Sequence, residues 1–221
     1  MMQEKSERHT QRSLPDVMPI FPLPGALLLP GGQLPLNIFE PRYLRMIDDA
    51  LAGARTIGMI QPRDPAAASG PSNLYGVGCA GRLTGFNETE DGRYLITLTG
   101  IRRFNLGSEL EVTTPYRQVA PDFGAFEDDS LIDVSADVVD RERLEEAMRC
   151  YLDSEGLKTD WEAVTDAPTD ALVSSLAMGC PFAPNEKQAL LEANNTQDRA
   201  ECLIALMEMS DGEDGSAAPL Q

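Results

Sequence analysis

Few side chains in this sequence have the type and spacing that catalysis requires. His9 is the only histidine among the 221 residues, and it lies in a polar amino-terminal segment. Nucleophile systems in which a histidine activates serine or cysteine are therefore excluded. Ser154 and Lys158 are one helical turn apart, but no glycine-rich loop accompanies them to supply an oxyanion hole. We expect no catalytic residue in this chain.

Cofactor and metal motifs are also missing from the sequence. Neither the G-x-x-x-x-G-K-[ST] phosphate loop nor the G-x-G-x-x-G dinucleotide loop occurs. The cysteines include no C-x-x-C pair, which favours buried free thiols over a zinc site; they are Cys79, Cys150, Cys180 and Cys202. We therefore expect neither a metal site nor a cofactor.

The charge of the chain is strongly negative and unevenly distributed. Of the net charge of −18, residues 1–124 contribute −1 and residues 125–221 contribute −17. Phosphate backbones and anionic membranes attract cations, so this distribution predicts no nucleic-acid partner and no membrane partner. Adjacent carboxylates such as Asp48-Asp49 and Asp128-Asp129 are expected to be solvated surface groups.

The ends of the sequence give an expectation of location. The amino terminus has no apolar leader, and no run approaches the roughly 18 apolar residues of a membrane span. With cysteines that are expected to stay reduced, the chain is predicted to be cytoplasmic.

The hydrophobic pattern divides the chain into four segments. Residues 1–15 and 211–221 have no hydrophobic period, which predicts a disordered tail at each end, the second one acidic. Residues 16–124 are expected to form a β-rich subdomain, and residues 125–210 a helical subdomain. The fold class is therefore α+β.

The β-rich segment shows short apolar or alternating runs bounded by proline and glycine. The prolines favour edges and bends over mid-sheet positions. Asp91-Gly92 supplies the positive φ of a tight hairpin turn. We predict strands at Met18–Pro22, Ala26–Leu29, Leu34–Phe39, Thr56–Gln61, Val77–Asn87, Arg93–Thr99 and Glu111–Val119.

Helical periodicity occurs once inside the β-rich segment and again after about residue 135. Pro41 fits the first position of the early helix, and Gly53 its end. The later helices are marked by apolar stripes at Leu144–Leu152, Leu172–Ala177, Leu190-Leu191 and Leu203–Met207. Asn195 or Thr196 is expected to cap the last helix.

An ordered set of segments resembles the amino-terminal domain of the Lon proteases. In chain order these segments are Met18–Leu23, Leu29–Gly31, Leu34–Tyr43, Leu74–Ala80 and Gly100–Phe104. Ser174–Phe182 followed by Glu186–Glu192 is similar to the helical half of short bacterial Lon-domain proteins. Each fragment alone is weak, but the ordered set is specific and covers most of the chain.

The resemblance implies a PUA-like β-barrel with one short helix inside it, followed by a C-terminal α-helical bundle. In full Lon proteases this region helps to recognise unfolded substrates and to assemble the hexamer. Nothing after residue 209 could hold an ATPase or a peptidase, so the resemblance implies a stand-alone domain that is not an enzyme.

The leading functional hypothesis is a non-catalytic module that binds peptide or unfolded protein segments in protein quality control. A protease or a chaperone is a further expected partner. The alternative is an RNA-binding or small-molecule-binding regulatory module built on the PUA-like barrel. A neutral β-half without a basic stripe weighs against RNA.

The cluster Phe39-Glu40-Pro41-Arg42-Tyr43 contains the first candidate binding residues, Phe39, Glu40, Arg42 and Tyr43. An architectural reading competes with this one. Glu40 suits a helix start, and Phe39 and Tyr43 can pack the barrel against that helix. Arg42 can pair with Glu40 or with an acidic helix.

Leu28 and Arg102 are the other candidate binding residues. Consecutive leucines at Leu27–Leu29 point to both faces of a strand, so one side must be covered or sticky, and coverage by the carboxy-terminal helices is favoured. Arg102 and Arg103 face opposite ways on a strand, and ion pairing with the acidic half is the favoured account of them.

Overall fold

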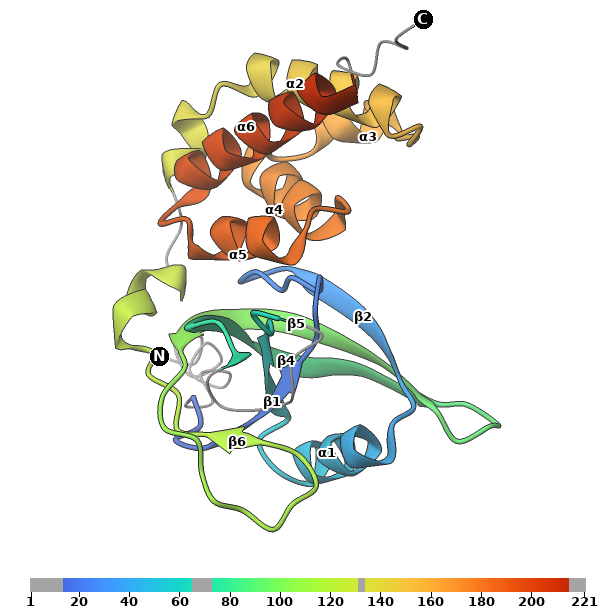
Figure 1. Ribbon diagram of the computed structural model, residues 1–221, viewed down its shortest axis with the longest axis vertical. Helices are drawn as coiled ribbons and strands as arrows, with labels where there is room; N and C mark the ends of the chain where they lie inside the picture. Colours follow the sequence, from blue (N-terminus) through green and yellow to red (C-terminus); the bar gives the residue numbers. More distant parts are fainter. Residues whose placement is uncertain (1–13, 65–72, 131–133, 215–221) are drawn as a thin grey trace, which may run out of the picture.

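The computed structural model describes residues 14–64, 73–130 and 134–214. The predicted tails, residues 1–15 and 211–221, lie mostly outside the described residues. The described chain has a sheet-containing half and a helical half, which stack on one another (Figure 1). The α+β class is therefore confirmed.

One mixed sheet organises the first half. It consists of β1 (Met18–Pro22), β2 (Gln33–Ile38), β3 (Thr56–Ile60), β4 (Val77–Glu88), β5 (Tyr94–Asn105) and β6 (Gln118–Val119). The strand order is β2-β5-β4-β3-β1-β6, in which β1 and β3 are parallel and the other neighbours antiparallel. Within the described residues β2 and β6 do not pair, so the sheet is open and closure of a barrel is not shown.

The β4–β5 hairpin, which the turn residues predicted, forms the longest ladder of the sheet. Gly92 has φ of 77°, a left-handed conformation that glycine adopts without steric cost. β5 continues past the expected end at Thr99 because Gly100 has no side chain; a Cβ there would clash with the Leu29 carbonyl oxygen. The register shifts between Leu83 and Gly85, which marks a bulge that bends the outer part of the hairpin.

Proline positions match the expectation only in part. Pro35 lies in β2, at one end of the sheet, opposite Thr97 of β5. Pro19 lies in β1, which pairs with β3 on one side and with β6 on the other. The short β6 lets β1 tolerate a residue that cannot donate a backbone hydrogen bond.

One predicted strand is wrong, and another is correct only at its last two residues. Ala26–Leu29 is irregular chain without strand pairing, and its three leucines are all buried in the core. In Glu111–Val119 only β6 forms, since Thr114 and Pro115 lie in a loop whose turn is closed by the Thr114 hydroxyl, which donates to the Tyr116 carbonyl at 2.9 Å.

The early helix, α1 (Pro41–Ala52), begins and ends where the sequence predicted. Pro41 occupies its first turn, and Gly53 is the C-cap. Its buried residues are Tyr43, Met46, Ile47 and Ala50, which face the sheet from the side opposite the helical half (Figure 1).

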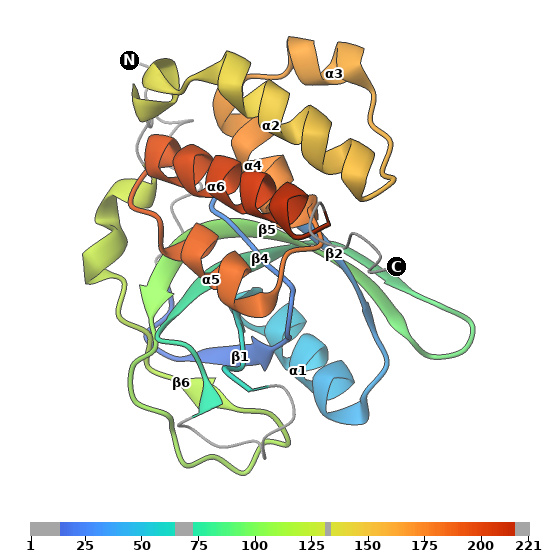
Figure 2. The same ribbon diagram turned by 45° about the horizontal axis from the view of Figure 1, so that its top comes forward.

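The helical half contains α2 (Arg141–Ser154), α3 (Trp161–Asp166), α4 (Thr169–Gly179), α5 (Pro184–Glu192) and α6 (Thr196–Asp214). Four of these helices were predicted, and the Asn195 side chain caps α6 by accepting from the Asp198 N–H at 2.8 Å. α3 was missed because it has only 6 residues, of which Val164 is the buried one. In both views α5 lies between α6 and the sheet (Figures 1 and 2).

Side-chain amides join α5 to the sheet. Gln61, just after β3, donates to the Pro184 carbonyl at 3.0 Å and accepts from the Gly25 N–H at 3.0 Å. Gln188 of α5 donates to the Val77 carbonyl of β4 at 3.1 Å. One hydrophobic core runs through this junction, from Leu28 and Ile57 of the sheet half to Leu190 of the helical half.

A buried ion pair fixes the sheet against the segment that leads to the helices. Arg103 of β5 and Asp129 of the 3₁₀ segment η2 (Gly124–Ser130) have side chains that are only 6% exposed. Arg103 Nη2 lies 2.7 Å from Asp129 Oδ1, and Nε also donates to the carboxylate. The guanidinium lies 4.7 Å from the centre of the Phe126 ring.

The same guanidinium binds the carboxyl end of α5. Nη1 donates to the carbonyls of Leu191 and Ala193, at 3.1 and 2.6 Å, and Nη2 donates to that of Asn194 at 3.3 Å. With the bonds to Asp129, all five N–H donors of Arg103 are used. The expected pairing of Arg102-Arg103 with the acidic half is therefore confirmed for Arg103, and Asp129 is not the solvated carboxylate that the sequence suggested.

We predict that Arg103→Ala lowers the free energy of unfolding by roughly 3–5 kcal/mol, because it leaves the Asp129 carboxylate buried without its partner. Urea denaturation measures the change. Arg143→Ala is the matched control: Arg143 and Glu208 form an ion pair whose side chains are about half exposed, worth at most about 1 kcal/mol. Equal losses in the two variants would contradict the prediction.

Candidate binding surface

Phe39 is the most exposed of the predicted binding residues. It follows the last paired residue of β2, Ile38, which lies opposite Tyr94 of β5. Its side chain is 64% exposed, so it does not pack the sheet against α1 as the architectural reading supposed. It presents an aromatic ring to solvent at the outer end of the sheet.

Glu40 and Arg42 form an exposed ion pair at the start of α1. Arg42 Nη2 lies 2.9 Å from Glu40 Oε2, and the two side chains are 47% and 44% exposed. Pairing of Arg42 with Glu40, one of the two partners expected, is confirmed. The Arg42 guanidinium also covers the Tyr43 ring, 4.5 Å from its centre.

Tyr43 is part of the core. Its ring centre lies 4.3 Å from that of Phe21 in β1, and the residue is 7% exposed. Burial raises the pKa of its phenol above the ordinary value. Tyr43 therefore holds α1 against the sheet, and a ligand does not reach it directly.

Leu28 and Arg102 are placed differently from one another. Leu28 is 1% exposed and packs against Gly81 of β4, where a side chain would leave no room for it. Nearby, the Met178 sulfur of α4 lies against Gly32, so helices cover this side of the sheet as expected. Arg102 is half-buried on β5, next to the buried Arg103.

The carboxylate pair Asp48-Asp49 holds two tyrosines rather than lying free in solvent. Tyr94 donates to Asp48 at 3.0 Å, and Tyr116 donates to Asp49 at 2.8 Å. The hydrogen bond from Tyr116 lowers the pKa of Asp49. Burial and the bond to Asp49 raise the pKa of Tyr116 to about 12. These contacts tie α1 to β5 and to the loop before β6.

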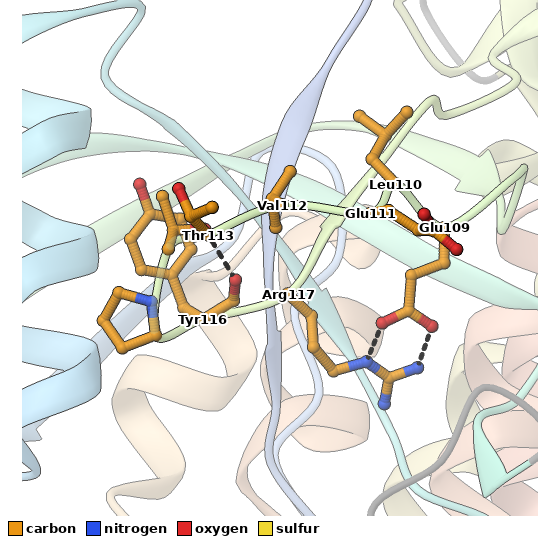
Figure 3. Close-up of a pocket in the computed structure, with 9 residues that line it drawn as sticks. Glu109, Leu110, Glu111, Val112, Thr113, Tyr116 and Arg117 are labelled. Carbon is orange, nitrogen blue, oxygen red and sulfur yellow. Dashed lines mark hydrogen bonds and ion pairs between the residues drawn. The ribbon is translucent and has the colours of Figure 1, made fainter.

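A shallow cavity of about 530 Å³ lies along the loop from Glu109 to Arg117. Figure 3 shows Arg117 and Glu109 pointing toward one another, with N–O distances of 2.6 and 2.8 Å. Val112 is 40% exposed beside them. The only cation among the residues that line this cavity, Arg117, is therefore already paired with Glu109.

Two smaller cavities open elsewhere. One, of about 290 Å³, lies between the end of α1 and the outer part of β4; its lining is Leu51, Arg55, Leu83, Thr84, Gly85 and Phe86. The other, of about 330 Å³, lies between the start of α2 and α6 and includes Val138, which is 64% exposed. Neither cavity was predicted from the sequence, although Phe86, an aromatic residue near the hairpin turn, is a local signal of exposed apolar surface.

The described part of the chain has neither an assembled metal site nor a reactive thiol among its buried cysteines. No group of three or more metal-binding side chains comes together there. His9 lies outside the described residues. Burial raises the pKa of Cys79 above its ordinary value and that of Cys180 to about 11, so both thiols stay protonated at neutral pH.

The family follows from a profile match over most of the chain. Residues 17–209 match the profile of the ATP-dependent protease La (LON) substrate-binding domain. This chain belongs to the Lon substrate-binding domain family. The match occupies nearly all of the 221 residues and leaves no room within them for an ATPase or a peptidase domain.

Bacterial Lon proteases are among its relatives. The chain is 30% identical over 115 residues to a Lon protease of Dictyoglomus thermophilum, which covers 52% of the chain and 14% of that protein. It is 27% identical over 207 residues to Lon protease 2 of Myxococcus xanthus, covering 89% and 24%. The chain thus spans a quarter or less of the length of these relatives.

Solved Lon-domain structures share the fold. A Lon N-terminal domain protein from Xanthomonas campestris has a TM-score of 0.59 and 21% identity, covering 86% of this chain and 97% of that one. The N-terminal domain of a Mycobacterium avium complex Lon protease has a TM-score of 0.63 and 14% identity, covering 87% and 98%. Among the described residues, no helix has the length and apolarity to cross a membrane.

We predict that Arg42→Ala changes the free energy of unfolding by less than about 1 kcal/mol, because its ion pair is exposed. Tyr43→Ala, at a core position of the same helix, should cost roughly 3–5 kcal/mol. Thermal and urea denaturation of the two variants provide the measurement. A large loss for Arg42→Ala would show that it has an architectural role.

We predict that stability falls between about pH 10 and 12. Folding raises the pKa of Tyr116 from 10.0 to about 12, so its contribution is complete below pH 10 and is lost as pH rises through the folded value. Tyr151 acts in the same direction. Urea denaturation at pH 8, 10 and 11 should show a shallower decline in Tyr116→Phe; a slope equal to that of the wild type would refute the assignment.

Proposed function

We propose that this domain is a non-catalytic binding module that captures peptide or unfolded protein segments in protein quality control. The match of residues 17–209 to the Lon substrate-binding domain carries the proposal. A cytoplasmic protease or chaperone is the partner that fits such a module, since a binding domain without catalytic groups must deliver what it holds.

Exposed apolar side chains at the outer end of the sheet support this proposal. Phe39 follows β2, Phe86 lies on β4 and Leu95 lies on β5; their side chains are 64%, 45% and 45% exposed. Leu95 is paired with Asn37 on one side and Asn87 on the other, so polar side chains surround it. Apolar groups within a polar surface suit a segment that exposes its own apolar residues when unfolded.

The alternative is an RNA-binding or small-molecule-binding module built on a PUA-like barrel, whose closure the strand pairings do not show. The arginines of the sheet half weigh against RNA, because many of them are bound to carboxylates: Arg42, Arg45, Arg93, Arg103 and Arg117. RNA binding needs cations that can displace counterions from phosphates.

We predict saturable binding of the domain to a fluorescent, reduced and carboxymethylated protein that cannot fold. The folded, disulfide-bonded form of the same protein should not compete, because its apolar side chains are buried. Fluorescence anisotropy at physiological salt provides the measurement. Binding of a generic RNA oligonucleotide in place of the unfolded protein would favour the alternative, and binding of neither would remove the proposal.

A further inference from the structure

The outer part of β4 has a free edge. β3 pairs with β4 from Met59 opposite Cys79 to Thr56 opposite Arg82, and the Leu83 N–H then donates to the Arg55 carbonyl at 2.8 Å. Beyond that bond β4 continues to Glu88 with β5 on one side and, within the described residues, no strand on the other. This part belongs to the hairpin that projects from the sheet in Figure 1. Such an edge is a template for an added strand.

An apolar groove lies beside this edge. The cavity of about 290 Å³ is bounded by Leu51 from α1 and by Leu83 and Phe86 from β4. Phe86 is 45% exposed although its ring meets the Tyr94 ring edge to face, with the ring centres 5.0 Å apart. A strand added along the edge would place alternate side chains toward this groove.

Two arginines at the start of the edge lack acidic partners. In a chain of net charge −18, neither Arg55 nor Arg82 has an ion pair or a side-chain hydrogen bond within the described residues. Arg55 is exposed and lines the groove, and its φ of 57° is a left-handed conformation that is unusual for arginine. Arg82 directly precedes Leu83, so its side chain projects from the opposite face of β4.

The far end of the edge has the opposite charge. Glu88 lies opposite Tyr94, and within the described residues it has no ion pair. The edge therefore runs from two cations at Arg55 and Arg82 to an anion at Glu88. A carboxylate is attracted at the first end and repelled at the second, which sets the position of an acidic side chain along the edge.

We propose, on the basis of the function proposed above, that residues Thr84–Glu88 accept an extended segment of the bound protein as an additional strand of the sheet. An apolar side chain of that segment enters the groove formed by Leu51, Leu83 and Phe86. The neighbouring residue of the segment is acidic. Its side chain points to the face of β4 that carries Arg82, at the end of the edge where Arg55 adds a second positive charge. Backbone hydrogen bonds supply affinity, and the apolar–acidic pair supplies specificity.

The test uses short labelled peptides and the intact chain. The probe alternates valine and threonine over eight residues and carries one leucine-glutamate pair. One control peptide replaces the glutamate by lysine, and another has N-methyl groups on alternate backbone nitrogens, which removes hydrogen-bond donors from an added strand. Fluorescence anisotropy should detect binding of the probe. Both control peptides should bind with much lower affinity than the probe.

Three single substitutions that each remove one positive charge then locate the site. Arg82→Gln and Arg55→Asn should each weaken probe binding about tenfold, which corresponds to about 1.4 kcal/mol; asparagine tolerates the left-handed backbone at position 55. Lys158→Gln is the matched control, since Lys158 is an exposed cation of the helical half. Melting temperatures verify that all three variants fold.

Charge reversal gives a second, independent readout. Arg82→Glu should reject the glutamate probe and accept the lysine peptide. Lack of probe binding, equal binding of the N-methylated peptide, or equal effects of Arg82→Gln and Lys158→Gln would each overturn the proposal.

If Arg82→Gln and Arg55→Asn still bind the unfolded protein as the wild type does, the edge is not the site while the proposed function stands. If the wild type does not bind the unfolded protein, the proposed function falls.

Discussion

The guanidinium of Arg103 holds the two halves of the molecule together. It is buried, and its five N–H donors bind Asp129 in η2 and three carbonyls at the carboxyl end of α5. A buried cation with one donor left unsatisfied would be costly, so β5, η2 and α5 must keep their positions relative to one another. Because these polar contacts fix the position of the helical half, the sheet and the helices can share one hydrophobic core.

Helices cover the inner part of the sheet and leave its outer part uncovered. The segment Leu27–Leu29 lies in the shared core, and Gly81 and Gly100 lack the side chains that would exclude it. In Figures 1 and 2 the tip of the β4–β5 hairpin projects beyond the helices of the C-terminal half. The exposed residues Phe86 and Leu95 lie there. One end of the β4–β5 ladder therefore packs in the shared core, and the other end is exposed to solvent.

Sequence patterns predicted the elements whose signals are local. Pro41, Gly53 and Asn195 mark helix ends, and Asp91-Gly92 marks the hairpin, because capping and turn geometry depend on a few neighbouring residues. Leu27–Leu29 was mistaken for a strand because burial on all sides produces the same apolar run as pairing in a sheet.

Site residues were harder to predict than elements. The sequence singled out Phe39–Tyr43 without showing that the ring at position 39 is exposed while the one at 43 is buried. Arg55 and Arg82 passed unnoticed, since the lack of an acidic partner is a property of three-dimensional placement. The groove beside β4 depends on where β3 begins, and that is set by the end of α1.

Pro35 makes the β2 edge of this sheet unlike the free edge of β4. At the β2 edge a residue without an N–H interrupts the row of donors that another strand would need, whereas β4 has no proline between Thr84 and Glu88. Two copies of the domain meeting through β2 would form a broken ladder, so this edge is protected against self-association and fibril growth. At this position the sheet would otherwise extend from one copy of the domain into the next, and the proline stops that extension.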